Sequence, residues 1–335
     1  MLIVGIGGTT LAPRERDWLA REQVSGVILF TRNFESREQV TRLVDEIRAA
    51  REAPLLVTVD QEGGPVQRFR DGFTRLPPLA RIGELHARDA RRAVALAEEH
   101  AWLMATEMRA VGVDLSFAPV VDLKRGNRAI GDRAFDADPD VTSELALAYL
   151  RGMRIAGMAA TLKHFPGHGS VLEDTHFAEA VDPRSYEQIE AEDLRPFRDA
   201  IQQGAEAVMV AHVRYPLVDE LPAGYSRRWI DDILRGELVF RGAVFADDVG
   251  MAAAHSAGSV AARVAAHLDA GCDFVPVCDP SLVPEALSAV EARDSSNESL
   301  VMRLQGYVGN TWEALVENSQ RQQFIERVTA LDVAA

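Results

Sequence analysis

The chain has 335 residues, 47% hydrophobic and 26% charged, a composition typical of a folded protein with a sizeable core. Its formal charge of -15 and isoelectric point near 5.0 argue against nucleic-acid binding, which requires a basic surface. No run of lysine and arginine offers such a surface.

Short β-branched and aliphatic runs recur along the chain and predict eight strands. Amphipathic stretches such as residues 37–52 and 90–112, with apolar residues at helical spacing, separate most of these runs. In chain order the predicted strands are Leu2–Ile6, Val24–Phe30, Leu55–Asp60, Val113–Val120, Ala159–Phe165, Ala207–Val213, Ala243–Val249 and Cys272–Val277.

The alternation of strand and helix is typical of parallel α/β proteins. Eight repeats favour a closed (β/α)8 barrel of the TIM type over an open doubly wound sheet. The GIGGTT segment near the start lacks the Gly-x-Gly-x-x-Gly spacing of a dinucleotide-binding turn. No linker-like composition divides the chain, so we expect one domain over residues 1–335, with the helices after Pro280 closing the barrel and covering its outside.

The opening MLIVGIGG has no basic region and is too short for the apolar core of a signal peptide. No segment of the sequence has the length and apolarity of a membrane span. Cys272 and Cys278 fall on one predicted strand, where a disulfide between them would be strained. We therefore expect a reduced, cytoplasmic monomer without a membrane partner.

Polar side chains close or follow several of the predicted strands. In a barrel of this class the active site is built at the carboxyl ends of the strands, so such residues are candidates for function. A single aspartate after a strand is equally well explained as a helix cap or an Asx-turn, whereas several on one face are not. The candidates are Asp60, Asp122, Lys163, His164, His212, Asp247 and Asp248.

The segment KHFPGHGSVLEDTH, Lys163 to His176, contains three histidines that suggest a metal site. His164 and His168 have the spacing of helical zinc motifs, but Pro166 and Gly167 between them prevent the helix, so zinc is disfavoured. Acyl transfer by a serine nucleophile is disfavoured, because the chain has no Gly-x-Ser-x-Gly elbow to present such a serine.

Glycoside hydrolysis requires a nucleophile or base on one side of the anomeric carbon and a proton donor on the other. Asp247 stands at the end of the seventh predicted strand, where a rigid element would hold a carboxylate nucleophile. Asp174 and His176 lie one residue apart on a long loop, and a carboxylate beside an imidazole suits a group that gives and takes a proton. Strand alternation does not decide between Asp247 and Asp248.

Four motifs in this chain resemble those of the family 3 glycoside hydrolases. They are VDQEGGPVQR (Val59 to Arg68), IGDRAF (Ile130 to Phe135), KHFPGHG followed by DTH, and FADDVGM (Phe245 to Met251). The closer resemblance is to single-domain bacterial β-N-acetylhexosaminidases of the NagZ type. Ala246, Val249 and Gly250 depart from the usual family residues and concern packing around the nucleophile rather than the nucleophile itself.

The resemblance implies a retaining barrel enzyme that needs no cofactor or metal. It would remove terminal β-linked N-acetylglucosamine from GlcNAc-1,6-anhydroMurNAc muropeptides during cell-wall recycling. Asp247 would be the nucleophile, and His176 the acid/base oriented by Asp174. The sugar would be held by Asp60, Arg68, Arg133, Lys163 and His164.

Two alternatives remain open. A neutral histidine base does not repel phosphate as a carboxylate would, so a β-N-acetylglucosaminide phosphorylase is one alternative. A non-catalytic sugar-binding barrel is the other. Such a barrel would have no use for Asp247, Asp174 and His176 together.

Overall fold

The computed structural model describes residues 1–175, 179–293, 297–306 and 311–333. It contains a strand in each of the eight predicted regions, which confirms the strand predictions. Most of the observed strands are shorter than the predicted ranges by one or more residues. They are β1 (Leu2–Gly5), β2 (Val24–Leu29), β3 (Leu56–Val59), β6 (Leu115–Ser116), β7 (Thr161–Phe165), β9 (Ala207–Val210), β12 (Ala243–Ala246) and β13 (Val275–Val277).

These strands form two parallel sheets, one ordered β13-β1-β2-β3-β6 and one ordered β12-β9-β7. At one edge Val120, beyond β6, forms an isolated parallel bridge with Lys163 of β7. At the other edge Phe245 of β12 bridges Phe274, which precedes β13. Single bridges rather than continuous ladders thus connect the sheets, and closure into a (β/α)8 barrel stays a prediction.

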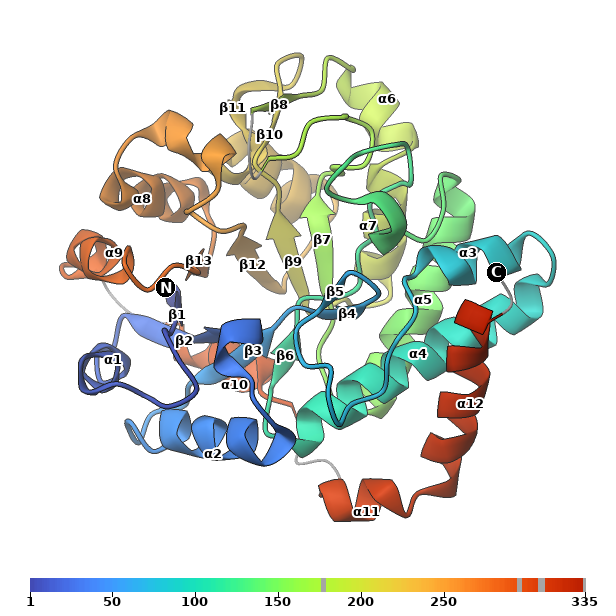
Figure 1. The fold of residues 1–335 in the computed structure, drawn as a ribbon. Helices are drawn as coiled ribbons and strands as arrows, with labels where there is room; N and C mark the ends of the chain where they lie inside the picture. Colours follow the sequence, from blue (N-terminus) through green and yellow to red (C-terminus); the bar gives the residue numbers. More distant parts are fainter. Residues whose placement is uncertain (176–178, 294–296, 307–310, 334–335) are drawn as a thin grey trace.

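Helices surround the sheets, and the two stretches predicted as amphipathic helices correspond to α2 and α4 (Figure 1). Side chains of Ser36 and Asp89 accept hydrogen bonds from backbone N–H groups in the first turns of these helices, satisfying donors that have no partner within the helix. The helices are α1 (Pro13–Leu19), α2 (Arg37–Arg48), α3 (Ala80–His86), α4 (Ala90–Ala110), α5 (Pro139–Ile155), α6 (Tyr186–Ala191), α7 (Leu194–Gln202), α8 (Val260–Ala270), α9 (Val283–Val290), α10 (Glu298–Leu304), α11 (Trp312–Val316) and α12 (Ser319–Val333).

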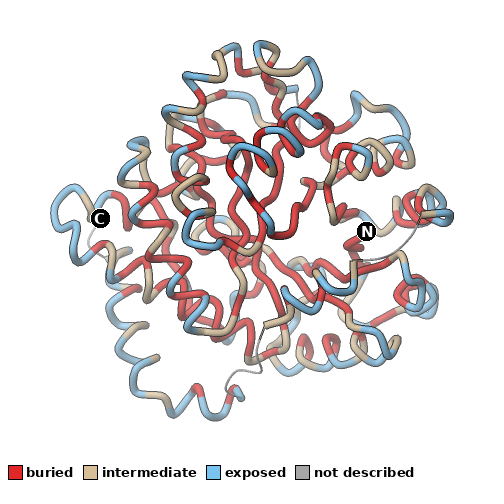
Figure 2. The backbone as a smooth tube through the Cα atoms, turned by 180° about the vertical axis from the view of Figure 1, so that it is seen from behind, coloured by how far each residue is buried: buried red, intermediate tan, exposed pale blue. Residues whose placement is uncertain are grey.

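Two apolar clusters account for the buried strands, and Figure 2 shows burial concentrated on the strands and on the inner sides of the helices. The larger cluster packs strand residues against helices. The smaller one includes Phe117, Phe245 and Phe274, whose rings pack at centroid distances of 5.2 Å and 4.9 Å. Because both faces of these strands are covered, their sequences read as continuous apolar runs rather than as an alternation.

Shorter strands lie in the connections that follow the central strands. A hairpin of β4 (Gln61–Gly63) and β5 (Val66–Gln67) follows β3. The long connection after β7 contains β8 (Ala180–Val181), which pairs with β10 (Val213–Tyr215), and β10 pairs with β11 (Asp219–Pro222). The connection predicted as an unbroken loop therefore contains a strand, which anchors its far end.

The helices after Pro280 cover the outside of the molecule in part, whereas Val301 and Leu304 of α10 join the strand residues of the smaller apolar cluster. Helix α9 contacts β1 and α8, and α12 contacts α4 and α3 (Figure 1). Within the described ranges, every helix is too short or too polar to cross a membrane.

The prediction that both cysteines occupy one strand is wrong. Strand β13 covers only Val275–Val277, so Cys272 precedes it and Cys278 follows it. Both thiols are free. The strand is shorter than predicted because β1 pairs only with these three residues.

Helices α4 and α5 approach closely at Gly152. A Cβ atom at this position would lie 2.2 Å from the backbone oxygen of Glu98 and 2.9 Å from the Cβ of Ala101. We expect Gly152→Ala to lower the free energy of unfolding by about 1–3 kcal/mol, because a backbone carbonyl cannot move aside as a side chain can. Urea denaturation measures this change. Gly8→Ala, where nothing lies within 4 Å, is the control, and equal stabilities of the two variants would contradict the close approach.

Candidate active site

A cavity of about 490 Å³ opens at the carboxyl-terminal ends of the central strands. Its apolar lining includes Ile28, Phe117 and Met209, and the remaining lining is rich in charged side chains. The structure thus places together most of the residues singled out in the sequence. Those that line the cavity are Asp60, Arg68, Arg133, Lys163, His164, Asp174, Asp247 and Asp248.

His176, the predicted acid/base, lies outside the described residues, so its role stays a prediction. The two residues before it are described. Asp174 lines the cavity, and Thr175 is buried beside it.

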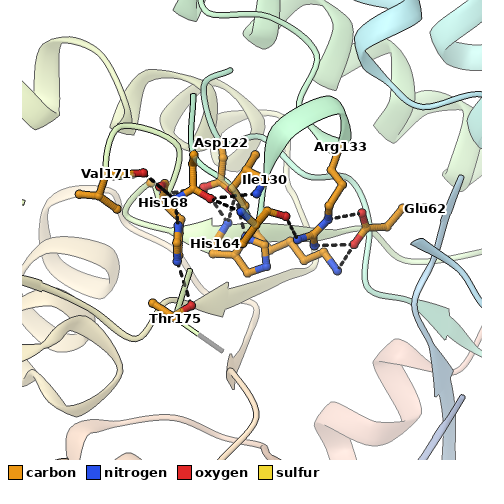
Figure 3. A network of polar contacts seen from close by, with 12 residues as sticks. Glu62, Asp122, Ile130, Arg133, His164, His168, Val171 and Thr175 are labelled. Atoms are coloured by element: carbon orange, nitrogen blue, oxygen red, sulfur yellow. Dashed lines mark hydrogen bonds and ion pairs between the residues drawn. The ribbon is translucent and has the colours of Figure 1, made fainter. Parts of the chain in front are cut away.

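Charges of opposite sign alternate along one wall of the cavity. Lys163 Nζ lies 2.9 Å from Asp60 Oδ1 and 2.6 Å from Glu62 Oε1. Arg133 donates to both carboxylate oxygens of Glu62, from Nε and from Nη2, each at 2.8 Å (Figure 3). Arg68 contacts the other oxygen of Asp60 at 3.5 Å. This order, Arg68, Asp60, Lys163, Glu62 and Arg133, pairs each charge with a neighbour of opposite sign.

Glu62 is the member of this row of charges that the sequence analysis missed. Its side chain is 2% exposed, and it does not line the cavity, so it acts on the site through Lys163 and Arg133. The signal was present: Glu62 stands two residues after Asp60 in the VDQEGG motif. It was overlooked because a buried carboxylate that holds two cations is a tertiary feature.

The charges also set the ionisation of the two carboxylates. Burial alone would raise the pKa of Asp60, but Lys163 and Arg68 bring it below its usual value. Burial likewise acts to raise the pKa of Glu62, and Arg133 and Lys163 outweigh it, so that the pKa falls to about 2. Both groups are therefore carboxylates at neutral pH.

Lys163 and His164 are neighbours in β7, yet both side chains line the cavity. The ladder with β9 shifts register between Lys163 and Phe165, so the usual alternation of strand faces is interrupted here. The peptide bond between Lys163 and His164 is cis. The ring of His164 donates from Nδ1 to Asp122 Oδ2 at 2.7 Å, which leaves Nε2 as the ring nitrogen not bonded to Asp122 (Figure 3).

Asp122, another strand-end candidate, does not line the cavity but holds His164, which does. Besides the His164 ring, it accepts hydrogen bonds from the backbone N–H groups of His164 and His168. Burial acts to raise the pKa of Asp122, while the two histidines lower it below its usual value.

Asp247 and Asp248 both line the cavity, which the sequence could not predict. Strand β12 ends at Ala246, so the rule that successive side chains alternate no longer applies to them. Asp248 accepts from the backbone N–H of Cys278 at 3.0 Å, and burial raises its pKa above the usual value. Asp247 accepts from the backbone N–H of Asp248 at 2.9 Å.

His212, also a strand-end candidate, is buried behind the cavity rather than in its wall. Its Nε2 lies 3.1 Å from the carbonyl oxygen of Asp248, to which it donates. Burial lowers the pKa of His212, and this effect outweighs the nearby charge of Asp247, which acts to raise the pKa. The ring is therefore neutral. It supports the backbone that carries the two aspartates.

The geometry of His164 and His168 bears on the zinc alternative. His164 Nδ1 is bonded to Asp122, and both ring nitrogens of His168 have partners, Asn127 and Thr175. No group of three metal-ligating side chains is found among the residues that the structure describes.

Comparison with known proteins agrees with the motifs. A model of the glycosyl hydrolase family 3 N-terminal domain matches residues 3–306. The β-hexosaminidase of Stenotrophomonas maltophilia strain R551-3 is 61% identical over 320 residues, covering 96% of this chain and 95% of that protein. The β-hexosaminidase of Xanthomonas axonopodis pv. citri strain 306 is 58% identical over 316 residues, covering 94% of each chain.

Solved structures give the same picture. NagZ from Neisseria gonorrhoeae in complex with N-trifluoroacetyl-D-glucosamine is 38% identical, has a TM-score of 0.92, and covers 98% of this chain and 97% of that one. A structure of the same protein in complex with zinc ion has a TM-score of 0.91.

The α/β fold, the charged cavity at the strand ends and the full-length match define a glycoside hydrolase. The chain belongs to glycoside hydrolase family 3, which confirms the motif resemblance.

The buried Glu62 makes the stability of the fold depend on pH in a specific way. Its folded-state pKa of about 2 lies below the ordinary 4.5, so its stabilisation is complete above pH 4.5 and is lost as the pH falls towards 2. We expect Glu62→Gln to be less stable than the natural protein at pH 7. Its stability should then fall less steeply with acidification, by up to about 1.4 kcal/mol per pH unit.

Urea unfolding at a series of pH values measures both effects. Glu52→Gln, at an exposed position, is the control and should follow the natural protein. Parallel pH profiles for Glu62→Gln and the natural protein would contradict the ionised, doubly paired state of Glu62.

Proposed function

We propose that the protein is a retaining β-N-acetylhexosaminidase that removes terminal β-linked N-acetylglucosamine. The observation that carries the proposal is the shared cavity. Asp247, from the end of β12, and Asp174, from the connection after β7, line it together with the Asp60 and Lys163 wall. The β-hexosaminidase relatives and the structure of a relative with a glucosamine derivative support the same reaction.

In this proposal Asp247 attacks the anomeric carbon and forms a glycosyl-enzyme. A carboxylate suits this step because it is held at a strand end, with its Oδ1 already accepting from the Asp248 N–H. His176, oriented by Asp174, protonates the leaving oxygen and then activates water in the second step. Two displacements at one carbon give net retention.

The sugar-binding roles follow from the charges of the wall. Asp60 is a carboxylate at neutral pH and can accept from two hydroxyl groups, more strongly than a neutral acceptor would. Arg68, Arg133 and Lys163 donate to hydroxyl or acetamido oxygens. His164 offers the ring nitrogen that Asp122 does not engage. Because Lys163 and Arg133 are already paired with Glu62, their positions are set before a sugar binds.

The natural substrate proposed is the GlcNAc-1,6-anhydroMurNAc muropeptide of cell-wall recycling. The full-length likeness to NagZ and to bacterial β-hexosaminidases supports this substrate class. We further propose that the protein acts in the cytoplasm as a monomer, without nucleic-acid or membrane partners and without a cofactor. The acidic composition argues against a nucleic-acid partner, and the free thiols of Cys272 and Cys278 agree with a reducing compartment.

We also propose that the two parallel sheets act as one closed (β/α)8 barrel. The isolated bridges Val120 to Lys163 and Phe245 to Phe274, one at each edge, support closure. So do flanking backbone hydrogen bonds, such as that from the Ala246 N–H to the Phe274 carbonyl at 2.8 Å.

Hydrolysis of a chromogenic N-acetyl-β-glucosaminide tests the reaction. Asp247→Ala should lower kcat/KM by at least roughly 10⁴-fold, because the nucleophile is lost. A slow fluorinated glycoside should leave its label on Asp247, and peptide mapping distinguishes this residue from Asp248. Full turnover by Asp247→Ala, or a label on any other residue, would refute the assignment.

The phosphorylase and sugar-binding alternatives make different predictions for the same substrate. A hydrolase should give free N-acetylglucosamine at a rate that added inorganic phosphate leaves unchanged. Formation of a sugar 1-phosphate would identify a phosphorylase, and binding of N-acetylglucosamine without any turnover would identify a binding protein. Product analysis by mass spectrometry, with and without phosphate, separates the three.

A further inference from the structure

Thr175 directly follows Asp174 in the connection after β7, and it is hydrogen-bonded both to His168 of that connection and to the segment that follows Asp247. Thr175 is buried, with 2% of its surface exposed, and its Oγ1 lies 2.9 Å from His168 Nε2 (Figure 3). Its carbonyl oxygen accepts from the backbone N–H of Ala253 at 3.2 Å. Ala253 lies in the short helix η5 (Ala252–Ala257), which follows β12 and the Asp247 turn. Thr175 therefore fixes the chain next to Asp174 relative to the segment that follows Asp247.

The direction of the His168 hydrogen bond is determined by Asn127. Asn127 Oδ1 accepts from the backbone N–H groups of Ala129 and Ile130, so its nitrogen must face His168. This Nδ2 group lies 2.9 Å from His168 Nδ1 and also faces the carbonyl oxygens of His168, Val171 and Glu173 at 3.2, 2.6 and 3.1 Å. A proton on His168 Nδ1 would point at this donor group, so the arrangement favours an Nδ1 without a proton. The proton of the neutral ring is therefore on Nε2, from which it is donated to Thr175 Oγ1.

The ionisation of His168 is consistent with this tautomer. Burial lowers the pKa of the ring to about 4 even though Asp122 acts to raise it, so the ring stays neutral at physiological pH. A neutral ring can donate from Nε2 to Thr175 while its Nδ1 faces the amide nitrogen of Asn127. A doubly protonated ring would place a second donor against that amide nitrogen.

His168 can serve as an anchor because its own backbone is held firmly. Its N–H donates to Asp122 at 2.7 Å, the carboxylate that also binds the ring of His164. On either side, the carbonyl of Gly167 accepts from Tyr215 Oη at 2.7 Å, and Gly169 passes so close to Leu123 that a Cβ atom would lie 1.8 Å from its oxygen. Thr175 is thus attached to the most constrained part of the long connection.

We propose that the His168–Thr175 hydrogen bond is the positioning contact for proton transfer in this enzyme. Through Thr175 it holds Asp174 in the lining of the cavity, where the proposed reaction needs it. His168 is a positioning residue, because it does not line the cavity and its two ring nitrogens are bonded to Asn127 and Thr175. The inference rests on the proposed function, in which Asp174 belongs to the acid/base pair.

The test compares two variants of nearly equal size. Thr175→Val removes the hydroxyl and keeps the shape, whereas Thr175→Ser keeps the hydroxyl. Both are assayed on N-acetyl-β-glucosaminides with a 2,4-dinitrophenyl leaving group, which departs without protonation, and a phenyl leaving group, which requires it. The ratio of kcat/KM for the two substrates reports proton donation separately from folding and sugar binding.

We expect Thr175→Val to lose about 10- to 100-fold in kcat/KM on the phenyl glycoside, a part of the roughly 10²- to 10⁴-fold that general acid catalysis supplies. On the dinitrophenyl glycoside its kcat/KM should stay near that of the natural protein, while kcat falls because the second step needs the base. Thr175→Ser should keep the natural ratio. Inhibition by N-acetylglucosamine should be unchanged in both variants.

Equal losses on the two glycosides, or no loss on either, would overturn the inference, since a purely structural role does not depend on the leaving group. If Thr175→Val does not fold, Thr175→Ala removes the same hydroxyl without placing a methyl group against the imidazole. Asp174→Asn is the reference for the proposed function. If kcat/KM depends strongly on the leaving group in Asp174→Asn but not in Thr175→Val, only the role of the His168–Thr175 contact is refuted. If neither variant shows this dependence, the acid/base assignment is refuted as well.

Discussion

The site depends on one buried interaction, the pairing of Glu62 with Lys163 and Arg133. A carboxylate with a 2% exposed side chain would be unfavourable without partners, and so would the buried ammonium group of Lys163. Together they form a network in which every charge has a neighbour of opposite sign, and Lys163 extends it to Asp60. The network keeps both carboxylates ionised and holds two cations at the cavity wall before any sugar arrives.

A second network supports the part of the site that carries His164 and Asp174. Asp122 binds the His164 ring and the His168 backbone, and His168 binds Thr175 (Figure 3). The first network therefore consists of ion pairs, and the second of a chain of neutral and charged hydrogen bonds. The difference suits their proposed tasks. A sugar-binding wall benefits from strong fixed charges, whereas a proton-transfer group must be able to change its charge during the reaction.

The parts of the molecule that were predictable are those in which a local pattern has one structural meaning. Apolar runs placed all eight strands, because parallel strands covered on both faces are continuously hydrophobic. Asp60, Lys163, His164 and Asp247 were found because each stands where an apolar run ends. Glu62 escaped notice since its importance lies in contacts with Lys163 and Arg133, the latter 71 residues away along the chain. The cysteines were misplaced because strand length depends on the pairing partner.

The sequence alone determined the order of strands and helices, the family motifs and the types of residue available to the site. These follow from periodicity and composition, which act over a few residues. Only the tertiary structure decided that Asp247 and Asp248 both reach the cavity, that His212 lies behind it, and that His168 is bonded through both ring nitrogens. Such choices depend on where a strand ends and on which distant groups satisfy a buried donor, and those are set by the packing of segments far apart in the chain.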